Sequence, residues 1–475
     1  GLEAHLLHAQ SLTRLGRGDE AQAVLAGLPE HEARDYVWAT AATMRAANLL
    51  FTPDGVAQSW AVIDEALASA PEGLVPQLLA FRVVQLAMEA RPHEAVELGQ
   101  SVDSSQLSAL AATILACGMA VALGDIGQPD AAALIAEEGN RRAAASPQAA
   151  YQAVALNLVY VDALVLSGRI EEAVALGDRV CRLWADIPRV PHTVATAING
   201  MAALAHGDLA AARVNIEAAL DETESRADST GLAYLLLVAY TETLARSGDV
   251  DGAMKAQSQM EAERHPSYVY MESGRLLARS WVAAARGRTT EAIVLAGQAA
   301  EFARAHGQHA REAMCLQAAM QFGDHRHASR LAELAKVAAG PRAGVVLQWA
   351  NALSDSDADE LMSISRGLED MGDNIGAADA AAQAAVIFKR DNRNGARLTA
   401  SGRAEATALL ERRRRQRLLL VGQHPGQMID MGGHGATFGG HRLPLKTPGN
   451  NRSPTLGTLA RPRTTFAESS RERRR

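Results

Sequence analysis

One short pattern constrains the fold of this chain more than any other feature of its sequence: a glycine, four further residues and an alanine, set between two helical segments. Eight copies begin at Gly16, Gly127, Gly168, Gly207, Gly248, Gly287, Gly323 and Gly372, and two degenerate copies begin at Thr52 and Ala90. Successive copies lie 36 to 49 residues apart. A single copy means little in a chain so rich in alanine, but ten copies at nearly constant spacing are typical of a helical solenoid.

The two residue types in the pattern have a physical reason. The glycine ends the first helix in a conformation that a Cβ atom disfavours. The alanine lies where the two helices of a pair approach closely, so a larger side chain would overpack by about 1–3 kcal/mol. Replacing Gly168 or Gly248 by valine is therefore expected to destabilise the array by more than the roughly 1 kcal/mol typical of compatible glycine changes.

The copy at residues 150–184 illustrates one predicted helix pair. Residues 150–166 are apolar almost all round, interrupted by Gln152, Asn157 and Asp162, so this helix is expected to be buried on two sides. In the following helix, apolar residues recur with the 3.6-residue period and charged residues fill the opposite face. Large aromatic side chains are interpreted as core residues rather than as ligand platforms: Trp60, Tyr151, Tyr160, Trp281 and Trp349.

Composition favours an all-α fold. The chain has 475 residues, of which 48% are hydrophobic but only 4% aromatic. Alanine is the best helix former, whereas the β-branched and aromatic residues that favour strands are scarce, so we predict an α-solenoid of about ten antiparallel helix pairs. The longest uncharged stretch, residues 104–124, is rich in small residues and is interpreted as a buried repeat helix rather than a membrane span.

The cysteines and the first residues indicate the compartment. Cys117, Cys181 and Cys315 lie far apart and show neither metal-binding nor disulfide spacing, which fits a reducing environment. No basic region followed by an apolar core is present near residue 1, so no export signal is visible. We expect a cytoplasmic protein. The chain begins without an initiator methionine, and the sequence alone does not tell whether it is a fragment of a longer protein.

Charge is distributed unevenly along the chain. From Arg412 onward there are 14 Lys and Arg against 3 Asp and Glu, whereas the preceding residues carry 33 against 51. The acidic body would not attract a phosphate backbone, so only the tail is a candidate for nucleic-acid contact. The candidate residues are Arg412, Arg413, Arg414, Arg415 and Arg417, with a solvated basic helix end as the alternative interpretation.

Three segments follow from these patterns. Residues 1–411 form the predicted repeat array, and residues 412–421 form the basic end of its last helix. Residues 422–475 contain nine Gly and five Pro with no apolar period, so we predict a disordered tail.

No motif for catalysis or for a cofactor is present. The sequence lacks GxxxxGK[ST], HExxH, CxxC and GxSxG. The densest histidine segment, residues 324–327, occupies a predicted repeat loop, and a metal site there would need ligands from elsewhere. We therefore expect no cofactor, no metal and no enzymatic activity.

The repeat loops resemble those of tetratricopeptide repeats, which read Gly-x-x-x-[Glu/Asp]-Ala. The best matches are residues 15–21 (LGRGDEA) and 167–173 (SGRIEEA). The longer spacing, and the last copy at 371–385 followed by Gly395-Ala396-Arg397, resemble the sensor region of the large ATP-binding, maltose-activator-like LuxR-family transcriptional regulators.

That resemblance covers residues 1–411 and departs from the family in two ways. The ATPase module that precedes the repeats in the family is absent here. The C-terminal helix-turn-helix is replaced by Gly/Pro/Arg-rich sequence, and one hypothesis is that this tail is an out-of-frame reading of a lost helix-turn-helix. DNA would then be bound only through a missing or damaged C-terminal domain.

The resemblance implies a non-enzymatic sensor segment that binds a regulatory protein or a small-molecule inducer on the concave face of the solenoid and controls attached domains. The alternative is a freestanding protein–protein adaptor unrelated to transcription. Neither interpretation involves a membrane, and the sequence alone does not name the binding residues.

Overall fold

The computed structural model describes residues 2–15, 17–27, 34–52, 54–184, 190–224 and 231–405. The chain divides into two units, residues 1–423 and 424–475, and all described residues belong to the first. The predicted loop residue Gly16, the arginines of 412–417 and the predicted disordered tail lie outside the described residues.

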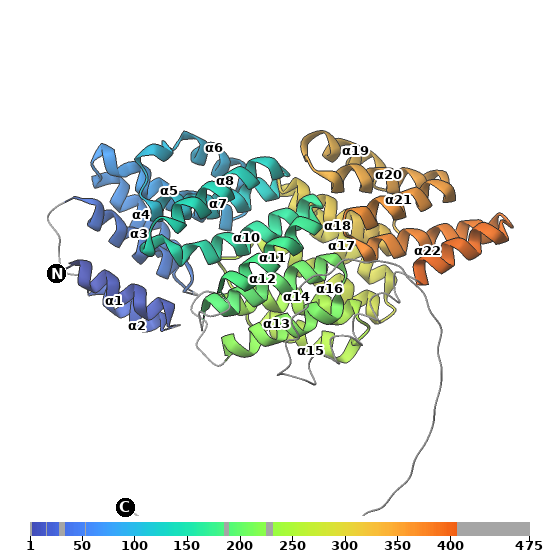
Figure 1. Cartoon of the computed structure of the whole chain (residues 1–475), viewed down its shortest axis with the longest axis horizontal. Helices are drawn as coiled ribbons and strands as arrows, with labels where there is room; N and C mark the ends of the chain where they lie inside the picture. The colour runs from blue at the N-terminus through green and yellow to red at the C-terminus, as the bar shows by residue number, and fades with distance from the viewer. Residues whose placement is uncertain are drawn as a thin grey trace, which may run out of the picture. The chain divides into compact units, whose positions relative to one another are not determined.

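Throughout the described residues the secondary structure is helical, with no strand, and most helices form antiparallel pairs (Figure 1). The first helices of the pairs are α1 (Leu2–Arg14), α3 (Tyr36–Leu50), α5 (Val75–Met88), α7 (Ala109–Asp125), α10 (Gln152–Ser167), α12 (Val190–His206), α14 (Leu232–Arg246), α16 (Glu272–Ala285), α18 (His309–Gln321), α20 (Pro341–Asp355) and α22 (Asn374–Arg390). The second helices are α2 (Gly18–Ala26), α4 (Val56–Ser69), α6 (Pro92–Ser101), α8 (Pro129–Ala144), α11 (Ile170–Trp184), α13 (Leu209–Glu224), α15 (Val250–Ala262), α17 (Thr289–Ala305), α19 (Ala328–Val337), α21 (Ala358–Asp370) and a helix that begins at residue 394. Short helices occupy some connections: η1 (Glu72–Leu74), η2 (Ser104–Gln106), α9 (Pro147–Ala150) and η3 (Val269–Met271).

The predicted solenoid and its loop chemistry are confirmed. The loop within a pair, here called the intra-repeat loop, has a residue with positive φ in most pairs: Ala90, Gly127, Gly168, Gly207, Gly248, Gly287 and Gly323. The alanine of the pattern is completely buried in most copies: Ala21, Ala95, Ala132, Ala173, Ala212, Ala253 and Ala292. These alanines allow the two helices of a pair to pack closely.

Two copies of the pattern are shifted along the chain. Ala57 is exposed, and the buried position in that pair belongs to Ser59, because α4 begins later than the spacing predicted. Ala328 is likewise only the first residue of α19, and Leu331 takes the buried position. In both pairs the intra-repeat loop is longer, so the helix meets its partner at a different residue.

The last predicted copy is a different kind of loop. Gly372 has a φ of 90°, as expected, but it connects α21 to α22 and therefore lies between two pairs. The intra-repeat loops in this region are at Ser356 and Asn392, whose φ values are 55° and 56°. Neither residue is glycine, so the pattern missed both loops, and this explains the 49-residue step from Gly323 to Gly372.

In the central pairs the first helices are enclosed, whereas the second helices have one solvated face. In α7, which contains most of the uncharged stretch 104–124, nearly every residue is buried. In α11 the buried residues fall on one stripe, as predicted for the copy at 150–184. Among the described residues no helix combines the length and apolar character needed to cross a membrane.

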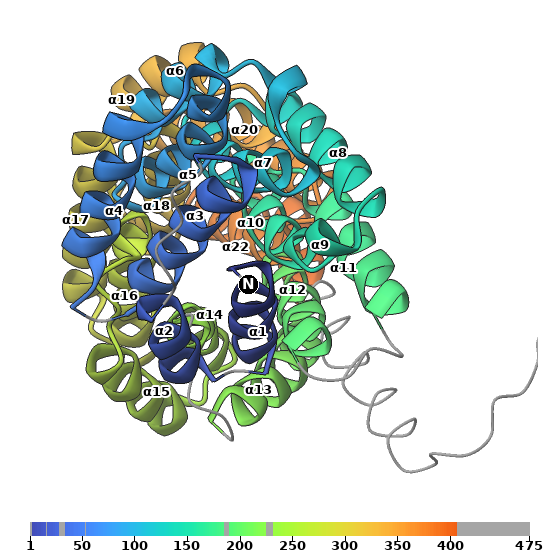
Figure 2. The same ribbon diagram turned by 90° about the vertical axis from the view of Figure 1, so that its left-hand side faces the viewer.

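The pairs wind around a common axis, so that segments far apart in the sequence lie side by side (Figures 1 and 2). Intra-repeat loops of the first half of the array pack against inter-repeat loops of the second half. The hydrogen-bonded partners are 168 to 217 residues apart in the chain. We call this set of contacts the seam.

The seam contains backbone contacts at several successive repeats. Ala339 N donates to Gly127 O at 2.7 Å, and Asn374 Nδ2 donates to His206 O at 2.8 Å. Further toward the N-terminus, His265 Nε2 lies 3.1 Å from Phe51 O. Each of these three intra-repeat loops therefore meets a loop between two later pairs.

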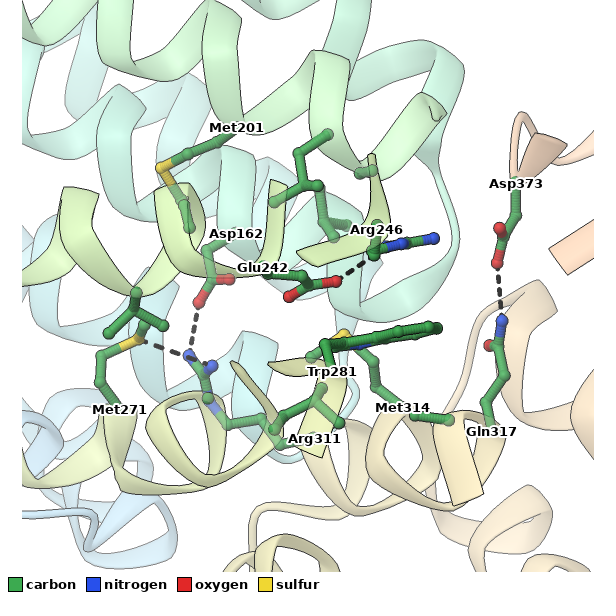
Figure 3. A pocket seen from close by; sticks show the side chains of 18 of the residues that line it. Asp162, Met201, Glu242, Arg246, Met271, Trp281, Arg311, Met314, Gln317 and Asp373 are labelled. Atoms are coloured by element: carbon green, nitrogen blue, oxygen red, sulfur yellow. Dashed lines mark hydrogen bonds and ion pairs between the residues drawn. The ribbon is translucent and has the colours of Figure 1, made fainter. Parts of the chain in front are cut away.

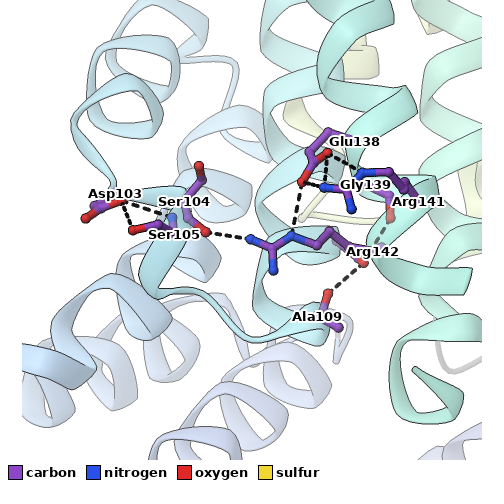
Figure 4. Close-up of polar contacts among 9 residues, drawn as sticks. Asp103, Ser104, Ser105, Ala109, Glu138, Gly139, Arg141 and Arg142 are labelled. Carbon is purple, nitrogen blue, oxygen red and sulfur yellow. Dashed lines mark hydrogen bonds and ion pairs between the residues drawn. The ribbon is translucent and has the colours of Figure 1, made fainter. Parts of the chain in front are cut away.

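A polar cluster fixes the connection between α6 and α7 on the outside of the array (Figure 4). Arg142 in α8 donates to Ser104 O at 2.7 Å and pairs with Glu138, which also accepts from Arg141. Asp103 accepts from the backbone N–H of Ser105 and begins η2. The cluster is mostly exposed. Because its contacts hold the connection between α6 and α7 in place, we interpret it as structural.

Candidate functional site

A cavity of about 130 Å³ opens where the first helices of the central pairs face the second half of the array. Side chains from α10, α12, α14, α16 and α18 form most of its wall, and Arg342 and Asp373 also line it (Figure 3). A water molecule needs about 10–15 Å³ by this measure, so the space holds about ten waters or a small organic molecule.

Most of the wall is apolar and deformable. Three methionines line the cavity, Met201, Met271 and Met314, and their unbranched side chains adapt to different shapes. Trp281 adds a broad ring that packs edge-on against Phe322 with 4.7 Å between ring centroids. The site therefore has the mainly hydrophobic lining, with a few charged groups, that is common in small-molecule sites.

Arg311 is the central charged residue of the wall. Its guanidinium is almost completely buried and donates to both Asp125 and Asp162, which come from α7 and α10. Gln308 donates to the other oxygen of Asp125 at 2.8 Å and to Tyr270 O. This network joins the first half of the array to α18 and forms part of the cavity wall.

Arg342 lines the cavity from α20. It donates to the carbonyl oxygens of Val165 and Leu166 at 2.9 and 3.2 Å, and so caps α10 from the other side of the seam. Its Nη1 also donates to Gln317 Oε1, and Gln317 in turn donates to Asp373 at 2.7 Å. The buried guanidinium is thus surrounded by acceptors.

Glu242 and Arg246 form the third charged group, one turn apart on α14. Arg246 Nη1 donates to Glu242 Oε1 at 2.8 Å, and the guanidinium lies over the Trp281 ring at 4.8 Å from the centroid. The Nε of Arg246 has no partner. The pair covers one side of Trp281, which leaves the carboxylate of Glu242 beside the cavity (Figure 3).

Burial changes the proton affinity of two carboxyl groups near the cavity. The pKa of Asp125 is raised to about 6, because burial outweighs the attraction of Arg311. Burial also raises the pKa of Asp379 to about 6, although Gln321 donates to it at 2.7 Å. The pKa of Arg342 is lowered by burial despite Asp373.

The sequence-predicted site residues fall elsewhere. The candidate nucleic-acid residues of 412–417 lie outside the described residues, so that prediction stays a prediction. In the segment 324–327, Asp324 accepts from Arg326, which holds the pKa of Asp324 near 2. No group of three potential metal ligands occurs among the residues that the structure describes.

Reasoning from the sequence missed the cavity because its residues come from six repeats. Trp281, interpreted as a core residue, packs against the core and also lines the cavity. One signal was visible: Asp162 interrupts a helix that is otherwise apolar all round. Glu242 and Arg246 interrupt α14 in the same way, and a charge in an enclosed helix needs a partner or a ligand.

Fold and site together define a tetratricopeptide-like helical-repeat protein with an internal cavity. No model of a known protein family matches the sequence, and no curated protein matches it at a significant level. Among solved structures, a chain of the APC/C hetero-tetramer Cut9–Hcn1 is similar, with 14% identity and a TM-score of 0.51, covering 90% of this chain and 79% of that one.

Two further structures are similar in part. A Rap protein complexed with competence and sporulation factor has 13% identity and a TM-score of 0.45, covering 70% of this chain and 99% of that one. The apo form of RapI has 11% identity and a TM-score of 0.39, covering 69% and 98%. At these identities, the Cut9–Hcn1 match supports the fold alone.

Proposed function

We propose that this chain is a non-enzymatic sensor segment that binds a small molecule inside the helical array and passes the binding event to attached domains. The main support for this proposal is the cavity, because its wall combines helices from both halves of the array. A ligand in contact with α10, α12, α16 and α18 favours the arrangement in which those helices are held together.

The attached domains that we propose are those of a LuxR-family regulator with an ATP-binding module. The loop motifs and the final repeats support this origin. Sequencing the DNA on both sides of the reading frame tests it. We expect an ATP-binding module encoded upstream and, in another frame, a helix-turn-helix downstream. Flanking DNA that encodes neither would overturn the regulator assignment.

A cavity-filling substitution tests the role of the site. Gly274 in α16 lines the cavity, and a Cβ added there would meet only ordinary contacts, 3.4 Å from Met271 Cε. Gly274→Leu is therefore expected to fold and to abolish ligand-dependent changes in the activity of the intact regulator. Gly297→Leu is the matched control on α17, where no atom lies within 4 Å of an added Cβ.

The second candidate function is an adaptor between proteins. The observation that favours it is the fold shared over most of the chain with a member of the Cut9–Hcn1 hetero-tetramer. Stable co-purification of a partner, unaffected by Gly274→Leu, would favour the adaptor over the sensor.

A further inference from the structure

The wall of the cavity has three carboxyl and three guanidinium groups, and two further carboxyl groups hydrogen-bonded to lining residues give an excess of negative charge. Lining residues and the residues hydrogen-bonded to them provide five carboxyl groups, Asp125, Asp162, Glu242, Asp373 and Asp379, against three guanidinium groups, Arg246, Arg311 and Arg342. In an enclosed space of low dielectric constant, an imbalance of this kind favours a positively charged ligand.

Each guanidinium already has a carboxylate partner, although the Nε of Arg246 lacks an acceptor. Arg311 is shared between two aspartates, and Arg342 is held by two backbone carbonyls, Gln317 and Asp373. Arg246 pairs with Glu242. An anion would compete with these carboxylates for the guanidinium groups, whereas a cation is attracted by a set of charged groups in which two carboxyl groups are in excess.

Two carboxylates are placed to meet a cation. Asp162 and Glu242 both line the cavity, from α10 and α14, and about a fifth of each side chain is exposed. Figure 3 shows that each carboxylate also has an arginine partner, Arg311 for Asp162 and Arg246 for Glu242. The methionines and Trp281 suit an apolar body attached to the charged group.

We infer that the cavity binds a small organic cation, an apolar molecule of about ten non-hydrogen atoms with one primary ammonium group held by Asp162 and Glu242. The inference rests on the proposed function, since it names the ligand class for the same site. The ammonium group supplies the missing positive charge, and the apolar body fills the space between the methionines.

The test compares three probes of similar size and different charge on the full chain by isothermal titration calorimetry: 2-phenylethylamine, 2-phenylethanol and 3-phenylpropionate. At pH 7.5 we expect the amine to bind with a dissociation constant of about 1–10 mM, as a small probe allows. The alcohol should bind at least tenfold more weakly, and the carboxylate should give no measurable binding.

Variants locate the charge preference. Glu242→Gln and Asp162→Asn should each weaken amine binding about tenfold and leave alcohol binding unchanged, and retained alcohol binding shows that the cavity is still folded. Glu301→Gln, on the exposed surface of α17, is the matched control and should change nothing. If both site variants bound the amine and the alcohol more weakly by the same factor, the result would count against a specific role for the two carboxylates.

The outcomes separate the ligand class from the site itself. Equal or tighter binding of the alcohol or the carboxylate, or no heat with the amine at 50 mM, overturns the cation. If the alcohol still binds and Gly274→Leu abolishes that binding, the cavity remains the site and only the ligand class is wrong. Probe binding that Gly274→Leu leaves intact would remove the cavity as the sensor site as well.

Discussion

At the residue scale, the loop glycines share one sequence pattern but have two separate roles, one in the loop conformation and one in packing across the seam. Gly168 and Gly248 both have positive φ, 87° and 81°. A Cβ at Gly168 would lie 2.4 Å from Met371 Sδ and 3.0 Å from the backbone N of Arg342, whereas a Cβ at Gly248 would meet no atom within 4 Å. Gly168 is therefore required both by the loop conformation and by the close approach at the seam. Gly248 is required by the loop conformation alone.

This difference predicts unequal costs for the same substitution. Gly248→Ala should lose about 1–2 kcal/mol, the cost of a left-handed conformation for an L-residue. Gly168→Ala should lose about 1–3 kcal/mol more, because the added methyl group overlaps the opposite side of the seam. Urea unfolding measures both values, and equal losses would show that the seam does not depend on Gly168.

Asp125 predicts an unusual dependence of stability on pH. Its pKa is about 6 in the folded protein and 3.8 in the unfolded chain, so folding binds a proton between these values. The stabilisation from this group is complete below pH 3.8 and is lost as the pH rises to 6, by about 1–3 kcal/mol. Arg311 stays charged throughout, since its own pKa is raised by the two aspartates.

The comparison of wild type with Asp125→Asn isolates this effect. Asparagine resembles the protonated aspartic acid in shape and cannot titrate. The free energy of unfolding of the wild type, relative to the variant, should therefore decrease from pH 4 to pH 6.5. A difference that stays constant or increases over this range would contradict the raised pKa.

At the scale of helices and loops, the single arginine Arg342 connects elements from both halves. It joins α20 to the C-terminal end of α10 and to the N-cap of α22. Because the guanidinium is buried and satisfies two carbonyl groups, its removal leaves several polar atoms without partners. The contact is local in space although its residues are far apart in the chain.

Arg342→Met should therefore destabilise the protein by about 3–5 kcal/mol, the usual loss when one partner of a buried ion pair is removed. Arg141→Met is the matched control, since Arg141 is exposed and its partner Glu138 keeps Arg142. It should change stability by about 0.5 kcal/mol or less. Similar thermal melts for the two variants would argue against the seam contact.

The helix pairs could be predicted from the sequence wherever their loops depend on steric limits between residues close together in the chain. Loop residues with positive φ and the buried alanines follow from steric limits within a few residues, so most pairs were located. Ser356 and Asn392 were missed because they adopt the same conformation without glycine. The seam and the cavity were not predictable, since both depend on how many pairs complete one superhelical turn.

At the scale of the whole array, the seam changes how a local perturbation spreads. In an open solenoid each repeat contacts only its neighbours, so damage stays near its origin. Here Arg311 contacts Asp125 across 186 residues of sequence. The first and second halves are therefore expected to lose stability together.

Arg311→Met tests this coupling. Hydrogen exchange should accelerate in α18 and equally in α7 and α10, because the buried Asp125 and the partly buried Asp162 lose their counter-charge. Arg304→Met, on the exposed face of α17, is expected to leave exchange unchanged in all three helices. Acceleration confined to α18 and its sequence neighbours would mean that the array behaves as an open solenoid.

The pairing of intra-repeat loops with inter-repeat loops also limits how the gene can vary. Open repeat arrays gain and lose single repeats readily, since a new copy only has to fit its neighbours. In this chain an inserted or deleted pair between His206 and His265 would move every later loop by one repeat and separate all the partners named above at once. Variation in length should therefore be confined to the ends, where the loops have no partner across the seam.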